Sequence, residues 1–252
     1  MREARGRKGA NGANGGSAVD SAALAQSLEA ASRVLREWQE RLAEDGPRSV
    51  WVVVSNVDPL HRAPDWVDQV VEMEHIWCAK LKLSADVAAY ELAGEDLERV
   101  VLEVDGPGAL AYLAMEHGVD RLAVAQKRNA RVSVQVVPRS ERPSLTGAGV
   151  ESIRHRSGRF QLPLSCLARI ELPERGMSLE LLGSDRETLS HLIHDLGDLF
   201  AKPSSLEVAR VYGEDGVGAR DPRTDARVLR LKDPVKGRLD RFLEGCRQQA
   251  RD

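Results

Sequence analysis

Basic residues gather in one stretch of the chain, and their chemistry is the easiest to assign. Nine Lys or Arg and two Glu lie between Arg121 and Phe160, although the net charge of the whole chain is −3. Such cations can neutralise nucleic-acid phosphates, and counterion release then favours binding. The alternative is a solvated surface with charge partners elsewhere in the fold. We expect phosphate contacts from Lys127, Arg128, Arg131, Arg154, Arg156 and Arg159, the last three at one loop tip.

Other patterns that resemble reactive sites are incomplete. The glycine-rich segments 146–149 and 213–218 lack the full glycine spacing of a dinucleotide loop and the lysine of a P-loop, so we interpret them as a hinge and a turn. His191 and His194 lie three residues apart on one expected helix, but a metal site needs a third ligand, and none is evident. We therefore predict no metal, no cofactor and no familiar catalytic constellation.

The composition is that of a globular protein with an aliphatic core. Of the 252 residues, 42% are hydrophobic, 30% are charged and only 4% are aromatic. No apolar run reaches the roughly 18 residues of a membrane helix, and the polar, glycine-rich start does not resemble a secretory signal. Cys78, Cys166 and Cys246 are far apart. These features predict a cytoplasmic protein without membrane contact.

The N-terminal part differs from the rest. Residues 1–18 are rich in Gly, Asn and Arg, which predicts a disordered basic tail. Over residues 19–45 apolar residues recur at spacings of four and three, which predicts a helix with an apolar seam. This seam either pairs with a partner helix or docks on its own domain. It contains Leu24, Leu28, Leu35, Trp38 and Leu42.

The remaining chain mixes strands and helices, which indicates an α+β fold. Residues 131–137 alternate valine with other residues, as a half-buried strand does. Pro64 suits the first turn of a helix, and Ser184 with Glu187 forms a capping box for another. Strands are expected near 50–54, 87–92, 99–104, 121–125, 131–137, 167–172, 177–182 and 206–212, and helices over 64–83, 108–116, 184–200 and 234–248.

Four motifs follow one another in order along residues 48–248. They are Ala63-Pro-Asp65-Trp66, Glu116-His-Gly118-Val-Asp120-Arg121, Ala209-Arg-Val-Tyr212 with Asp221-Pro-Arg-Thr224, and Gly237-Arg-Leu-Asp-Arg-Phe242. Together they resemble bacterial class I peptide chain release factors, especially the factor-2 branch. We interpret Glu116, Gly118 and Arg121 as residues that maintain the fold, namely a turn glycine and a salt-bridged pair.

The resemblance implies a division of the chain. A release-factor-like central α/β domain would comprise residues 46–142 and 205–252. Residues 143–204 would form the reduced remnant of the catalytic-type domain, a β-sheet with a helix. Two prolines, two serines and two glycines within residues 138–149 are typical of a hinge between such parts.

The departures from the family concern its two functional tripeptides. Release factors hydrolyse the peptidyl-tRNA ester with a Gly-Gly-Gln loop, whose glycines allow close backbone approach. This sequence contains no Gly-Gly-Gln. Counting back from Arg169-Ile170 places those positions at Ser157, Gly158 and Arg159. A long cation would replace the compact amide, which implies that no catalytic residue remains and that hydrolysis is lost.

The resemblance also implies that the stop-codon loop of the family is shortened here. Leu122–Asn129 contains no Ser-Pro-Phe or Pro-x-Thr equivalent, and Asp120 stands where the family has His. We expect a release-factor-like protein of translation that binds the ribosome or a structured RNA without peptidyl-tRNA hydrolysis. One alternative is a divergent release or rescue factor that still hydrolyses peptidyl-tRNA, using Gly158 and nearby amides. Another is a protein-interaction scaffold that uses the N-terminal seam.

Overall fold

The computed structural model describes residues 47–57, 64–123, 129–140, 149–172, 177–201, 206–214, 218–236 and 238–249. Residues 43–252 form one compact unit. The predicted tail and N-terminal helix, with the seam from Leu24 to Leu42, lie outside the described residues, as do Lys127 and Arg128. Within the described ranges, no helix combines the length and apolar character needed to cross a membrane.

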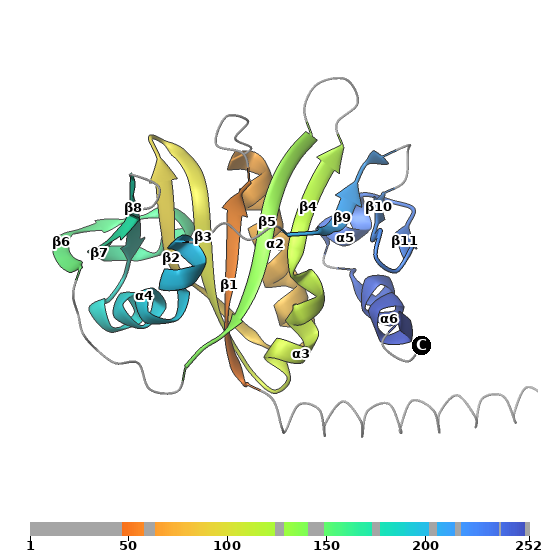
Figure 1. The fold of residues 1–252 in the computed structure, drawn as a ribbon, viewed down its shortest axis with the longest axis horizontal. Coiled ribbons are helices and arrows are strands. Elements are labelled where there is room, and N and C mark those ends of the chain that lie inside the picture. The colour runs from red at the N-terminus through yellow and green to blue at the C-terminus, as the bar shows by residue number, and fades with distance from the viewer. Residues whose placement is uncertain are drawn as a thin grey trace, which may run out of the picture. The chain divides into compact units, whose positions relative to one another are not determined.

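One hydrogen-bonded sheet of eleven strands runs through this unit (Figure 1). Its strand order is β11-β10-β9-β4-β5-β1-β3-β2-β8-β7-β6. Neighbouring strands are antiparallel, except that β4 and β9 are parallel. The strands are β1 (Ser49–Asn56), β2 (Ser84–Ala93), β3 (Asp96–Asp105), β4 (Gly118–Ala123), β5 (Asn129–Pro138), β6 (Val150–Ser157), β7 (Pro163–Leu172), β8 (Met177–Gly183), β9 (Val208–Tyr212), β10 (Ala219–Arg220) and β11 (Arg227–Val228).

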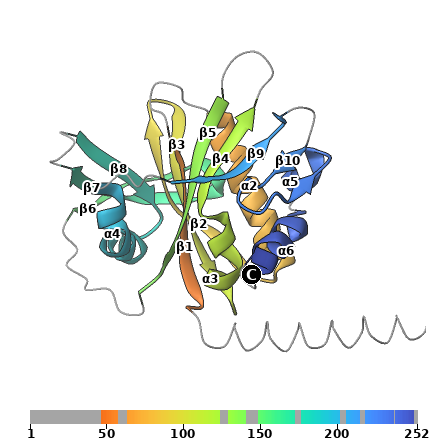
Figure 2. The ribbon, with the colours of Figure 1, turned by 45° about the vertical axis from the view of Figure 1, so that its right-hand side comes forward.

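Short and long helices cover the sheet (Figures 1 and 2). Helix α2 contacts β1, β2, β3 and β5, whereas α4 contacts mainly β6, β7 and β8. The helices are α2 (Pro64–Lys80), α3 (Ala109–Leu113), α4 (Arg186–Ala201), α5 (Lys232–Val235) and α6 (Asp240–Gln249), with 3-10 turns η1 (Ala114–Glu116) and η2 (Arg159–Gln161). These elements confirm the expected α+β class.

Strand β1 lies at the centre of the packing. Val50, Val52 and Val54 belong to the apolar core that includes the buried residues of α2. Trp51 and Val53 belong to a second core that includes the apolar face of α4. Both faces of β1 are therefore buried, which explains why residues 50–54 are apolar throughout instead of alternating.

Two details of the helices differ from expectation. Asp185, not Ser184, caps α4, because its Oδ1 accepts a hydrogen bond from the Thr188 N–H at 2.7 Å. The expected closing helix is split into α5 and α6. The Arg238 N–H donates to the Asp233 carbonyl at 2.9 Å, and a bond that reaches back five residues closes a helix end.

The predicted remnant of the catalytic-type domain, residues 143–204, contains β6, β7, β8 and α4. It joins the rest of the sheet where β8 pairs with β2, through Ala89↔Gly183 and Tyr90↔Leu182. The division into a central and an inserted domain stays a prediction.

Candidate nucleic-acid interface

Arg154 and Arg156 lie in strand β6, not at the loop tip where they were expected. The ladder between β6 and β7 changes register between Ser152 and Arg156, where β6 contains two residues more than β7. A bulge of this kind bends a strand and redirects its side chains. β6 is also the last strand in the sheet order, so it lies at an edge. The bulge and the edge position leave both arginine side chains exposed.

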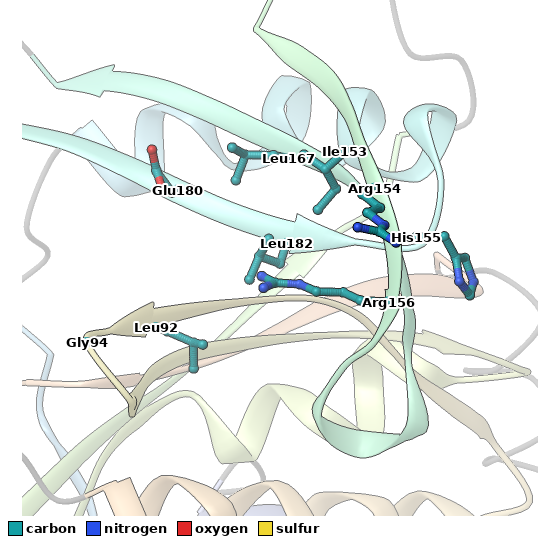
Figure 3. Close-up of a pocket in the computed structure, with 9 residues that line it drawn as sticks. All are labelled: Leu92, Gly94, Ile153, Arg154, His155, Arg156, Leu167, Glu180 and Leu182. Carbon is teal, nitrogen blue, oxygen red and sulfur yellow. The ribbon is translucent and has the colours of Figure 1, made fainter.

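The two arginines line a cavity of about 640 Å³ (Figure 3). In Figure 3 the Arg156 side chain extends between Leu92 and Leu182, while His155 points away from them. Within the described ranges, neither Arg154 nor Arg156 has an ion-pair partner. The cavity is lined by Leu92, Gly94, Ile153, Arg154, His155, Arg156, Leu167, Glu180 and Leu182.

The acidic residue in this cavity does not neutralise the two arginines. The Glu180 carboxylate accepts a hydrogen bond from Arg169 Nε at 2.8 Å on the neighbouring strand. The cavity thus offers two unpaired guanidinium groups beside aliphatic side chains. This combination suits a phosphate together with a less polar group.

The turn between β6 and β7 holds Ser157, Gly158 and Arg159, the positions that we expected to correspond to Gly-Gly-Gln. The Gly158 N–H donates to the Leu162 carbonyl at 2.9 Å, and the Arg159 N–H donates to the Tyr90 hydroxyl at 3.1 Å. A Cβ at Gly158 would lie 2.6 Å from that hydroxyl and 2.7 Å from Leu164 Cγ. The turn is therefore packed against β2 and β7, with no space for a side chain at Gly158.

The next residues of the turn have an unusual backbone. Phe160 and Gln161 have φ values of 57° and 58°, in the left-handed region that residues with a side chain rarely adopt. Each such residue costs of the order of 1 kcal/mol, so surrounding contacts must hold the turn in place. One of these contacts joins Arg159 to Asp68 on α2, with 3.5 Å between the charged groups. Burial raises the pKa of Asp68, and Arg159 partly opposes this effect.

The structure does not bring all the predicted phosphate contacts together. Arg154, Arg156 and Arg159 follow one another along β6 and its turn. Arg131 is exposed on β5, and five strands separate β5 from β6 in the sheet order. At about 4.8 Å per strand, the path across the sheet from β5 to β6 is roughly 30 Å. One compact basic surface on the described chain can therefore include the three arginines of the β6 region but not Arg131.

The release-factor-like motifs meet in the core, not at the cavity. Arg210 of β9 forms a bidentate ion pair with Glu116, and both side chains are about 1% exposed. Beside this pair, the Tyr212 hydroxyl donates to Asp120 Oδ2 at 3.4 Å. The predicted pair between Glu116 and Arg121 is wrong, because Arg121 bonds Glu214. Glu116 pairs instead with a residue 94 positions away in the sequence.

Two buried carboxyl groups in this cluster lack full pairing. Among the described residues, Glu74 Oε2 and Asp120 Oδ1 have no hydrogen-bond partner. Burial raises the pKa of Glu74 well above its ordinary value, and the Glu116 carboxylate adds to this. Burial raises the pKa of Asp120 to about 7, against the opposing effect of Arg210. The buried position of these groups indicates a role in the fold rather than in binding.

The other motif residues also have structural contacts. Arg223 donates to the carbonyls of Met115 at 2.7 Å and His117 at 3.1 Å. These bonds link the Asp221–Thr224 motif to the start of β4. Gly118 has φ +150°, and a Cβ there would lie 2.6 Å from the Ala209 Cβ. Gly118 therefore permits the close approach of β4 and β9, although it begins a strand and does not form a turn.

The paired histidines of α4 have ordinary protein partners. His191 is buried, and its Nε2 lies 2.8 Å from the Ser140 carbonyl and 3.3 Å from an Asp195 oxygen. His194 is exposed and lies against the same aspartate. The described ranges contain no cluster of three or more His, Cys, Asp or Glu residues placed to hold a metal ion.

The described architecture is a release-factor-like fold. A solved structure with this arrangement is RF2 of Thermus thermophilus, which superposes with a TM-score of 0.59 at 17% sequence identity. The similarity covers 90% of this chain and 77% of that one. No family model and no curated protein sequence matches the chain. The fold expected from the ordered motifs is thus confirmed, at an identity that supports the fold alone.

Proposed function

We propose that this chain is a release-factor-like protein of translation, acting in the cytoplasm, that binds the ribosome or a structured RNA and does not hydrolyse peptidyl-tRNA. The release-factor-like fold supports a binding partner within the translation machinery. The unpaired Arg154 and Arg156 on an exposed strand support an RNA contact.

The packed turn at Gly158 is the observation that carries the loss of hydrolysis. A backbone that must approach an ester needs a free glycine surface and a compact amide beside it. Here Tyr90 and Leu164 fill the side of Gly158 where a Cβ would point, and Arg159 follows it. Gly158 is half-buried, and the packing of its Cβ side together with the cation that follows it supports the loss of hydrolysis.

Co-sedimentation with ribosomes across a salt series tests the RNA contact. We expect salt-sensitive pelleting of the unaltered protein. The double variant R154A/R156A should pellet less and should lower the salt slope by about two, because roughly one counterion is released per lost phosphate contact. The control R227A/R238A removes the same charge from two exposed arginines that are already paired with Asp225 and Asp233. Equal slopes for the two double variants would contradict the assignment.

One observation favours retained hydrolysis as a second candidate. Gln161 is exposed on the same turn, three residues after Gly158, and carries the amide group that Arg159 lacks. A peptide-release assay on ribosomal termination complexes separates the candidates. The proposed function predicts no release above background. Release that disappears in Q161A, with ribosome pelleting unchanged, would establish the enzyme instead.

A further inference from the structure

The β6–β7 turn presents an aromatic ring to solvent. Phe160 is 37% exposed, and it is the one aromatic residue among the exposed large hydrophobic side chains of the described ranges. Its ring meets Tyr90 edge to face, with 6.2 Å between centroids and 70° between planes. That contact supports one side of the ring and leaves more than a third of the side chain uncovered. Burial of an aromatic ring is favourable, so a ligand that covered the open side of Phe160 would be stabilised by it.

The ring is also held in place before any ligand arrives. The Leu162 N–H donates to the Arg159 carbonyl at 3.0 Å, and the Tyr90 hydroxyl accepts from the Arg159 N–H at 3.1 Å. These bonds flank Phe160 and Gln161 and maintain their left-handed backbone. A pre-ordered aromatic side chain loses little conformational entropy on binding.

Two cations precede the ring closely in the sequence. Arg156 occupies one of the last residue pairs of the β6–β7 ladder before the turn. Arg159 directly precedes Phe160 and is partly exposed beside its ion-pair partner Asp68 of α2. An aromatic face beside guanidinium groups is the pattern with which proteins bind single-stranded nucleic acid, since a base stacks on the ring and phosphates meet the cations. A paired base in a duplex does not offer its face. The local charge favours a polyanion over an apolar partner.

We propose that the β6–β7 turn binds an unpaired nucleotide of RNA, with Phe160 stacked on the base and Arg156 and Arg159 on neighbouring phosphates. This proposal rests on the RNA partner proposed above and specifies which RNA element the turn recognises. It also gives the strained backbone a role, because the left-handed residues turn Phe160 outward next to Arg159.

The test compares single-stranded and duplex RNA on the full chain. A fluorescent single strand of about eight nucleotides, and the duplex of the same sequence, are titrated by anisotropy. The unaltered protein should bind the single strand more tightly. F160L keeps an apolar side chain over Tyr90 but removes the aromatic face, so it should weaken single-strand binding roughly 5- to 150-fold and leave duplex binding unchanged. F160W should restore the single-strand affinity.

The remaining outcomes separate this site from the proposed partner. The stacking site is overturned if F160L weakens binding of both RNAs equally or of neither. In that case the proposed function still holds if ribosome pelleting depends on Arg154 and Arg156. Single-strand binding that depends on Phe160, without ribosome pelleting, upholds the site and overturns the ribosomal partner. Competition by an acidic peptide at least as effective as by the RNA would overturn the assignment to nucleic acid. Thermal melting of each variant confirms that it folds.

Discussion

Replacing Asp120 by Asn should make the stability of the protein less dependent on pH. The side chain is buried beside Tyr212, and its Oδ1 has no hydrogen-bond partner among the described residues. Asparagine has nearly the shape of a protonated aspartic acid and cannot ionise. The side chain at position 120 is therefore neutral at every pH in D120N, whereas Asp120 of the unaltered protein changes its charge within the core.

The size of the effect follows from the raised pKa. The pKa of Asp120 is about 7 in the folded chain, against an ordinary value of 3.8. Between these values the folded chain holds a proton that the unfolded chain has released, so raising the pH favours unfolding. The stabilisation is fully present below pH 3.8 and is lost as the pH rises through about 7. At about 1.4 kcal/mol per pH unit, the loss reaches roughly 4 kcal/mol.

Urea unfolding of the unaltered protein and D120N at about pH 4.5, 5.5, 6.5 and 7.5 measures this term. The free-energy difference between the two proteins should shift in favour of D120N by about 1 kcal/mol per pH unit. Burial lowers the pKa of His117, so this residue makes the stability rise with pH. Both proteins contain His117, and its contribution therefore cancels in the difference between them. D225N is the control, because Asp225 is exposed and its pKa is lowered by Arg227. A difference that stays constant with pH would refute a protonated Asp120 in the folded chain.

Three further predictions concern stability and use the same unfolding assay. G118A should destabilise the fold by roughly 2–4 kcal/mol because its Cβ would clash between strands β4 and β9. G197A should stabilise α4 by about 0.5–1 kcal/mol because no atom lies within 4 Å of its Cβ, and similar values for the two variants would contradict the packing argument. R210M should lower the free energy of unfolding by about 3–5 kcal/mol because it leaves Glu116 without its partner in the core. The double variant E116L/R210M should recover much of this free energy, and no recovery would mean that the ion pair itself stabilises the fold. Q161G should gain about 1 kcal/mol by relieving the left-handed backbone, and a loss would show that the glutamine side chain supports the turn.

Most buried elements were predictable from the sequence because their residues repeat at a regular spacing. Strand β5 alternates its valines, and the apolar run of β1 predicted a strand. Strand β6 was missed, because residues 151–156 are mostly exposed at the edge of the sheet and therefore polar on both faces. Without an apolar period, arginines in an edge strand resemble arginines in a loop.

The candidate site was predictable only in part. Charge alone identified Arg154, Arg156 and Arg159, but charge does not show that a sheet separates them from Arg131. Phe160 was not identified, because a single aromatic residue has no spacing to interpret. Its left-handed backbone depends on hydrogen bonds to a strand about seventy residues earlier, which no local pattern records.

The parallel pairing of β4 with β9 has a consequence for synthesis. Glu116 leaves the ribosome 94 residues before its partner Arg210. At roughly 5–20 residues per second, the interval lasts about 5–20 s. During that interval the nascent chain has an open β4 edge and an uncompensated acidic group, while β6 to α4 can already assemble locally. The pairing of β4 with β9 therefore waits for the last fifth of the chain, and a translational pause within that interval would extend the exposure of the unpaired β4 edge.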